Sequence, residues 1–342
     1  MAQHFMENFR ILVAKHESVA GTMETPTSTD FRTKIRNIVV TPSVEIEPNK
    51  YATGHHGEAD AISGKQSATV TFDILMAWGG AATTAPSYSL FDFACGQYPH
   101  TYTSTGYALH PLKAYDEYTL TMWIYDIQDG ASPNAMCYKV AGAVGNCQIT
   151  ADGVGKPFTK KYTFTGKLVD IDFSVPFASI PILNNLESTC TDKALLTDVT
   201  INGSSRLVNA ITVDYGNEIT AIEDMSDATG ILHYGITKRS PKVSLNPLMA
   251  YGVDDYNLLN SGATGCAQTV PVIIDANHFK ITVPKARLSA GAVAARDGRI
   301  GMDMTFDCVF NGVTGMWGDT GMLGDSGIVG EATLELLIGA RA

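Results

Sequence analysis

The chain has 342 residues, which is long for one domain and predicts two domains of ordinary size. Only 17% of the residues are charged, below the usual ~25%, which indicates that much of the surface is covered in an oligomer. The net charge is −11, with 13 Lys and Arg against 17 Asp and Glu in residues 1–180 and 11 against 18 in residues 181–342, so neither half has the basic surface of an ordinary DNA-binding protein.

Neither membrane insertion nor a disulfide framework is indicated. The first ten residues are polar and lack the apolar segment of a signal peptide. No apolar run approaches the ~20 residues of a membrane span. No two cysteines form a CxxC pair, so we expect reduced, mostly buried thiols, although Cys137 and Cys147 could meet across a hairpin. The six cysteines are Cys95, Cys137, Cys147, Cys190, Cys266 and Cys308.

Strand patterns dominate the chain. Residues 67–76 alternate between an apolar face that includes Val70 and Phe72 and a polar face that includes Thr71 and Asp73, which predicts a half-buried strand. The same alternation recurs at 117–127, 160–169, 278–283 and 300–310. It predicts a mostly antiparallel sheet with one solvated face. Short helices are predicted at 87–95 and 250–260.

The order of the elements repeats along the chain. In the first half, a strand at 35–42, an acidic stretch at 45–64 and a strand at 67–76 precede strands at 137–150 and 160–169. Their counterparts in the second half lie at 208–216, 216–230, 235–250, 278–291 and 301–312. We interpret this as two copies of one β unit, residues 1–180 and 181–342, joined near the prolines of segment 174–185. Both acidic stretches are expected to be mobile until a neighbouring chain or ring holds them.

Three segments resemble the tail tube proteins of siphophages, which are long-tailed bacteriophages. Residues 11–42 contain a K-x-E-S-x-x-G-T segment, and residues 43–78 contain a long loop followed by a G-K strand entry. Residues 214–250 contain a G-N-E motif, an acidic spacer and an I-T-x-R-x-P-x-x-S-L strand. The resemblance rests on order and spacing over nearly the whole chain, and the part after residue 311 departs from it.

The resemblance implies a mainly β fold with two tandem tail-tube-type β-sandwich or barrel domains, each with a short flanking helix. It implies a structural subunit without enzymatic activity or cofactor. Three chains would form a pseudo-hexameric ring, and stacked rings would form a tube that conducts genomic DNA during ejection without specific binding. Tail terminator, tape measure and baseplate proteins are the implied partners. The implied location is the phage tail of the virion, assembled in the cytoplasm of a bacterial host.

A DNA channel should not bind its cargo, because each Lys or Arg that pairs with a phosphate adds affinity and friction. Strand faces that carry Asp, Thr and Ser would instead form a hydrated, repulsive wall. The alternative is that such faces are simply the solvated surface of a monomer. The candidate lumen-lining residues are Asp73, Asp214, Glu218, Asp303 and Asp307.

Two further patterns are assigned to contacts between rings. Metal ligands need a fixed geometry, and the histidine-rich cluster in the Gly-bounded loop 54–64 is expected to lack one, so we expect a polar contact between rings and no metal there. The glycines at every third position from Gly312 to Gly330 are expected to form a surface or inter-ring loop. The candidate inter-ring residues are His55, His56, Glu58 and Asp60.

Catalytic motifs are absent from the sequence, which has no G-x-S-x-G, H-E-x-x-H or P-loop pattern. Adjacent carboxylates such as Asp116 and Glu117 would point to opposite faces of a strand. Two other functions stay open. One is another virion ring protein of the same fold, such as a tail terminator or baseplate hub. The other is an all-β protein that binds or acts on carbohydrate, which would need exposed aromatic residues along a cleft.

Overall fold

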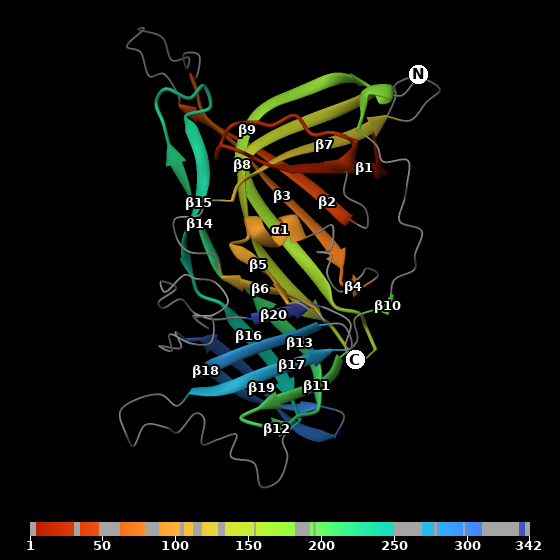
Figure 1. Ribbon diagram of the computed structural model, residues 1–342, viewed down its shortest axis with the longest axis vertical. Coiled ribbons are helices and arrows are strands. Elements are labelled where there is room, and N and C mark those ends of the chain that lie inside the picture. The colour runs from red at the N-terminus through yellow and green to blue at the C-terminus, as the bar shows by residue number, and fades with distance from the viewer. Residues whose placement is uncertain are drawn as a thin grey trace, which may run out of the picture.

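A computed structural model of the chain shows how these patterns are arranged (Figure 1). The described residues are 5–30, 35–47, 62–78, 89–102, 106–111, 118–128, 134–153, 155–181, 192–193, 196–248, 269–276, 279–296, 298–309 and 335–338. The predicted helix at 250–260, the glycine repeat from Gly312 to Gly330 and the loop with His55, His56, Glu58 and Asp60 lie outside the described residues.

The described elements are almost all strands. Those of the first half are β1 (Phe5–His16), β2 (Ile35–Glu47), β3 (Ile62–Leu75), β4 (Ala77–Trp78), α1 (Ser89–Ala94), β5 (Gln97–Tyr102), β6 (Gly106–Pro111), β7 (Leu120–Gln128), β8 (Asn134–Ala151) and β9 (Thr159–Pro176). Those of the second half are β10 (Asp192–Lys193), β11 (Leu196–Ile201), β12 (Ser204–Ser205), β13 (Val208–Asp214), β14 (Asn217–Glu223), β15 (Ile231–Arg239), β16 (Lys242–Pro247), β17 (Thr269–Ala276), β18 (Phe279–Arg296), β19 (Arg299–Cys308) and β20 (Glu335–Ile338). Two 3-10 turns lie at Ser28–Asp30 and Phe177–Ser179.

The mainly β prediction is confirmed, and every strand pairing is antiparallel. Sixteen of the described strands join one large sheet. Period-two alternation decides which side chains are buried: Val70 and Phe72 of β3 face the core, while the alternating residues Thr71 and Asp73 do not. The predicted strands at 67–76, 160–169 and 300–310 correspond to β3, β9 and β19. The predicted helix at 87–95 corresponds to α1, which spans Ser89–Ala94.

The two halves repeat one strand order. In the first half the hydrogen-bonded order is β1-β7-β8-β9-β3-β2. In the second half it is β11-β17-β18-β19-β16-β13. Corresponding strands also follow one another in the same order along the chain. Six strands of each half therefore share both pairing order and chain order, with β2 matching β13 and β8 matching β18.

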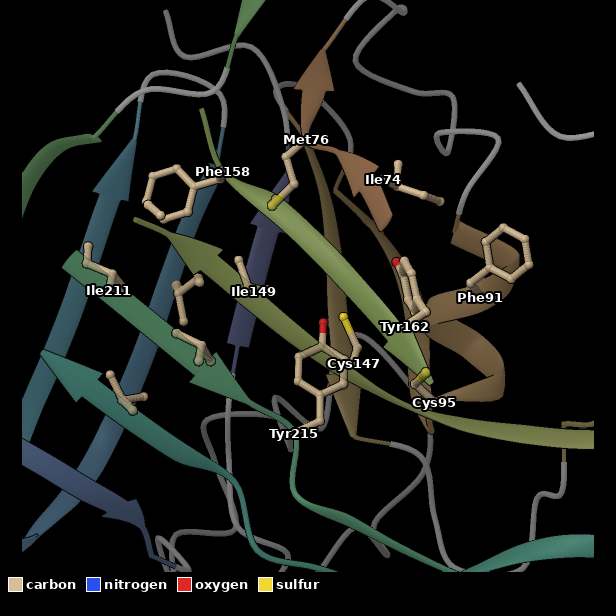
Figure 2. Close-up of a cluster of buried hydrophobic side chains, with 14 of the residues drawn as sticks. Ile74, Met76, Phe91, Cys95, Cys147, Ile149, Phe158, Tyr162, Ile211 and Tyr215 are labelled. Carbon is tan, nitrogen blue, oxygen red and sulfur yellow. The ribbon is translucent and has the colours of Figure 1, made fainter. Parts of the chain in front are cut away.

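The halves are joined through strand β13, which pairs with the end of β8 from Ile211 opposite Ala151 to Asp214 opposite Gln148. The core also runs across this junction. Ile211 and Tyr215 of the second half pack in the same buried cluster as Cys147 and Ile149 of the first (Figure 2). Among the described residues, the expected boundary at residue 180 therefore does not separate two hydrophobic cores.

Two sequence predictions are wrong in this region. Residues 216–230 were expected to be a mobile loop, but they contain β14 and the turn to β15, which form a hairpin beside β8 and β9 (Figure 1). Residues 235–250 were expected to be one strand, but the strand is interrupted between β15 and β16, and these two strands belong to different sheets. Pro241 lies at the break and has no N–H with which to continue a ladder.

The described cysteines agree with the expectation of reduced, buried thiols. Cys95, Cys137, Cys147 and Cys308 are all buried and free, so no disulfide joins Cys137 to Cys147. Burial raises the pKa of the Cys137 thiol to about 12 and that of the Cys308 thiol to about 12. The other two cysteines of the sequence lie outside the described residues.

Candidate functional site on the polar face of the sheet

A single row of mostly charged side chains crosses both halves on the sheet face opposite the core. Directly paired residues on neighbouring strands point to the same face, so the ladder registers define the row. We call it the charged row. In order from β2 to β18 it consists of Arg36, Asp73, Lys161, Gln148, Asp214, Lys242, Asp307 and Arg287. Three of the predicted lumen-lining residues therefore belong to one continuous feature that spans the junction.

The charged row alternates in sign. Asp73 lies opposite Arg36 and Lys161. Asp307 lies opposite Lys242 and Arg287, and its carboxylate is 3.2 Å from the Arg287 guanidinium. The alternating sequence pattern predicted Asp, Thr and Ser on these faces. Four cations accompany the three aspartates, so the row is nearly neutral rather than acidic.

The aspartates are also held by neutral donors. The Asn37 side-chain amide donates to Asp73 over 2.7 Å, and the Asn146 amide donates to Asp214 over 2.8 Å. Asp214 also accepts the backbone N–H of Gly216 at 2.8 Å. Asp214 therefore orients the chain at the start of the β14–β15 hairpin in addition to its place in the row.

A second row on the same face carries hydroxyl groups. It runs beside the charged row across β9, β8, β13, β16 and β19, and the Ser244 and Thr305 hydroxyls are 3.2 Å apart. We call it the hydroxyl row. Its members are Thr159, Thr150, Thr212, Ser244 and Thr305. Together the two rows make a hydrated surface that crosses the junction without interruption.

The remaining predicted lumen residues lie in different places. Asp303 is on β19, two positions from Thr305 and opposite Ala292, so it shares the polar face. Glu218 is on β14, outside the large sheet, and its exposed carboxylate lies 3.9 Å from Lys238. The structure therefore groups four of the five candidates on one face and leaves Glu218 on the hairpin.

The first resemblance segment is organised by the buried carboxylate of Glu17. This carboxylate accepts the Thr119 and Thr121 hydroxyls at 2.6 and 2.8 Å. It also accepts the backbone N–H groups of Gly21 and Gly142 at 2.7 and 2.8 Å. Four donors compensate for the burial of the carboxylate. Glu17 is thus a structural anchor for the chain after β1.

The G-N-E motif is also structural. Gly216 has a φ of 62°, and a Cβ on it would lie 2.1 Å from the Ser240 carbonyl oxygen, so the turn requires glycine. The Asn217 side-chain amide donates to the carbonyl groups of Cys95 and Gly145 at 2.7 and 2.9 Å. The motif therefore fixes the β14–β15 hairpin of the second half onto the first half.

The two resemblance segments meet at the junction. A Cβ on Gly21 would lie 2.1 Å from the carbonyl oxygen of Leu232 in β15, so the loop after β1 lies directly against the hairpin. Lys167 of β9 pairs with Asp227 of the hairpin turn at 2.7 Å. Partial burial opposes the charge on Asp227, but hydrogen bonds from Lys167 and Thr229 outweigh it and lower its pKa to about 2.

One buried ion pair fixes α1 to the core side of the sheet. The Lys160 ammonium donates to both oxygens of Asp92 at 2.8 and 2.6 Å, and the Tyr162 hydroxyl donates to Asp92 at 2.9 Å. Both charged side chains are fully buried. Burial raises the pKa of the Tyr162 hydroxyl well above its ordinary value, so the hydroxyl keeps the proton that it donates to Asp92.

Neither a protein-family model nor a curated protein sequence matches the chain. Within the described residues, no helix is long and apolar enough to cross a membrane. In the same residues, no three His, Cys, Asp or Glu side chains are grouped closely enough to hold a metal ion.

Proposed function

We propose that the chain is the tail tube subunit of a siphophage, in which three copies close a ring and stacked rings enclose a DNA channel. The observation that carries this proposal is the continuation of the sheet across the internal repeat. Strand β13 extends the first half's sheet, and the charged row crosses the junction. Repeated units joined head to tail generate either a closed ring or an open filament, depending on the rotation between them.

A simple geometric estimate supports a ring of six halves. Each half contributes four strands to the polar face, namely β2, β3, β9 and β8 in the first and β13, β16, β19 and β18 in the second. Six halves would form a 24-stranded barrel. With strands about 4.8 Å apart and tilted by about 40°, its backbone diameter would be about 48 Å. That width leaves room for a DNA duplex inside the side chains.

The paired charges of the polar face would limit DNA binding by neutralising one another, whereas a purely acidic wall would repel DNA. Each cation of the charged row lies beside at least one carboxylate. Lys161 lies between Asp73 and the neutral Gln148. A phosphate that passes the row meets cations whose charge is already balanced, so few counterions are released and little affinity is gained. The hydroxyl row adds hydrogen-bonding groups without adding charge.

The resemblance adds the expected setting: a virion protein whose partners are tail terminator, tape measure and baseplate proteins. No cofactor and no enzymatic step belong to this role. The other ring proteins of the same fold share the same predicted geometry, so stacking is the property that separates them from a tube subunit.

The test is to determine the mass and shape of the purified assembly. Three chains of 36.6 kDa give a ring of about 110 kDa with a six-fold appearance in negative-stain images, and rings should stack into tubes. Rings built from six full chains would contradict the pseudo-hexamer. Single rings that never stack would favour a terminator or hub, and a monomer at all concentrations would contradict the proposal altogether.

A further inference from the structure

The junction within the chain shows how one copy of the repeat covers the next. Strand β13 pairs with β8 on the edge that β7 leaves free after Ala143. The inward-facing side chains at that end of β8 are then covered. Cys147 and Ile149 are fully buried, and the Tyr215 N–H donates to the Cys147 carbonyl at 3.0 Å.

The corresponding end of the second half has no such cover in the described structure. Strand β18 matches β8, and β17 pairs with it only as far as Arg287. Beyond Arg287, no described strand occupies this edge. The inward-facing pairs near its turn are Val293 opposite Met302 and Ala295 opposite Ile300, which correspond to Cys147 opposite Tyr162 and Ile149 opposite Lys160. Val293 is 56% exposed and Ile300 is 61% exposed.

The first half also has a strand edge that no described strand covers. Strand β2 matches β13, and among the described strands it pairs only with β3, so its outer edge is unpaired. Residues 41–46 of this strand are all exposed. Val44 faces the same way as the buried residues of β3 but is 44% exposed, and Ile46 is 66% exposed. The position equivalent to Val44 is Tyr215, directly after β13, which is 2% exposed and packs in the same buried cluster as Cys147 of the first half.

We infer that strand β2 of one copy adds to the free edge of β18 in a second copy, as β13 adds to β8 within the chain. This inference rests on the proposed function, because it takes a second copy of the chain as the partner. It assigns the two surfaces and their polarity: a head-to-tail contact between unlike edges. Repeating the register of the internal junction puts Val44 opposite Val293 and Pro42 opposite Ala295.

The contact satisfies two physical requirements. It removes two unpaired strand edges, which would otherwise promote uncontrolled pairing. It also buries the apolar side chains of Val44, Val293 and Ile300. Pro42 has no N–H to donate, so the added ladder is short and the apolar contact contributes more than it would in a long strand pair.

The experiment uses two variants, each of which blocks one edge with a charge. Val44→Glu blocks β2 and leaves β18 open, whereas Val293→Glu blocks β18 and leaves β2 open. Each variant alone should stay monomeric by light scattering after size-exclusion chromatography. An equimolar mixture should give a one-to-one dimer and no larger species, because only one pair of edges remains compatible. The control is Val169→Glu, a substitution at a valine that is 37% exposed on β9, which should assemble like wild type.

The outcomes separate the inference from the proposed function. Wild-type rings together with normal assembly of Val293→Glu or Val44→Glu would overturn the assigned edges and leave the ring proposal standing. Monomeric blocked variants whose mixture stays monomeric would overturn the head-to-tail polarity. A wild-type protein that never assembles, in addition to a mixture that gives no dimer, would overturn both.

Discussion

Removing carboxylates from the polar face should turn a neutral surface into one that binds DNA. The variant is Asp73→Asn, Asp303→Asn and Asp307→Asn in one chain, which adds three charges per chain and nine per three-chain ring. Arg36, Lys161 and Arg287 would then lack their aspartate neighbours, and Lys242 would keep only Asp214. Asp214 is kept because it also holds Asn146 and Gly216. The fold should change little, because the Arg287–Asp307 pair is solvent-exposed and such pairs contribute about 0–1 kcal/mol.

The size of the effect follows from counterion release. The logarithm of duplex affinity falls with the logarithm of salt concentration with a slope of about −0.9 for each phosphate contact. A fourfold rise in salt therefore weakens binding about 3.5-fold per contact, or about 40-fold for three new contacts per chain. Binding of a labelled DNA duplex to assembled rings, measured by fluorescence anisotropy at 50 and 200 mM salt, gives this slope.

A matched variant controls for total charge. Asp152→Asn, Asp170→Asn and Glu218→Gln add the same three charges at exposed positions off the charged row. This variant should keep the weak, shallow salt dependence of wild type. Equal affinity and equal salt slope for the two triple variants would refute the idea that the polar face is the surface that meets DNA.

Three further predictions concern stability and reactivity. Asp227→Asn should lower the stability of the fold towards urea at pH 7, and the difference from wild type should disappear near pH 2. The folded-state pKa of Asp227 is lowered to about 2, so its carboxylate stabilises the fold above its ordinary pKa and loses this contribution as the pH falls through 2. Asp92→Ala should lower the free energy of unfolding in urea by about 3–5 kcal/mol, because it leaves Lys160 buried without its carboxylate. Asp92→Leu combined with Lys160→Met should recover most of that loss. Equal losses for the two variants would argue against a buried charge effect. Cys137, whose pKa burial raises to about 12, should resist iodoacetamide at pH 8 in the folded protein and react in urea, as measured by mass spectrometry of its peptide; rapid labelling without urea would show that it is accessible.

Local patterns in the sequence were sufficient to predict several of the strands. Alternation of apolar and polar residues identified β3, β9 and β19, and it assigned Asp73, Asp303 and Asp307 to a face away from the core. This works because side chains alternate sides along a strand irrespective of what the strand pairs with. The order of segments also indicated an internal repeat, and the matching strand orders of the two halves agree with that interpretation.

The hairpin β14–β15 shows where local reading failed. Its residues were interpreted as a mobile acidic loop because Asp, Glu and Gly are frequent there. In the structure, Ile219 and Ile236 pack against a buried cluster in which Val144 of the first half joins Ile231 and Tyr234 of the hairpin. Asn217 donates to two backbone carbonyl groups of the first half. Burial of an alternating pattern this short depends on a partner that is distant in the sequence, so local composition could not reveal it.

The sequence by itself determined the mainly β fold, the facing of strands such as β3, β9 and β19, and the repeated order of elements, because these depend on periods of two residues and on chain order. Only the tertiary structure decided that Asp73, Asp214 and Asp307 share one row with Arg36, Lys161, Lys242 and Arg287. Neighbours in that row are separated by up to 88 residues along the chain, as Asp73 and Lys161 are. A shift of one residue in any ladder would move a strand's side chains to the other face. The charge of the polar face is therefore a property of strand register, which is set by the packing of the common core.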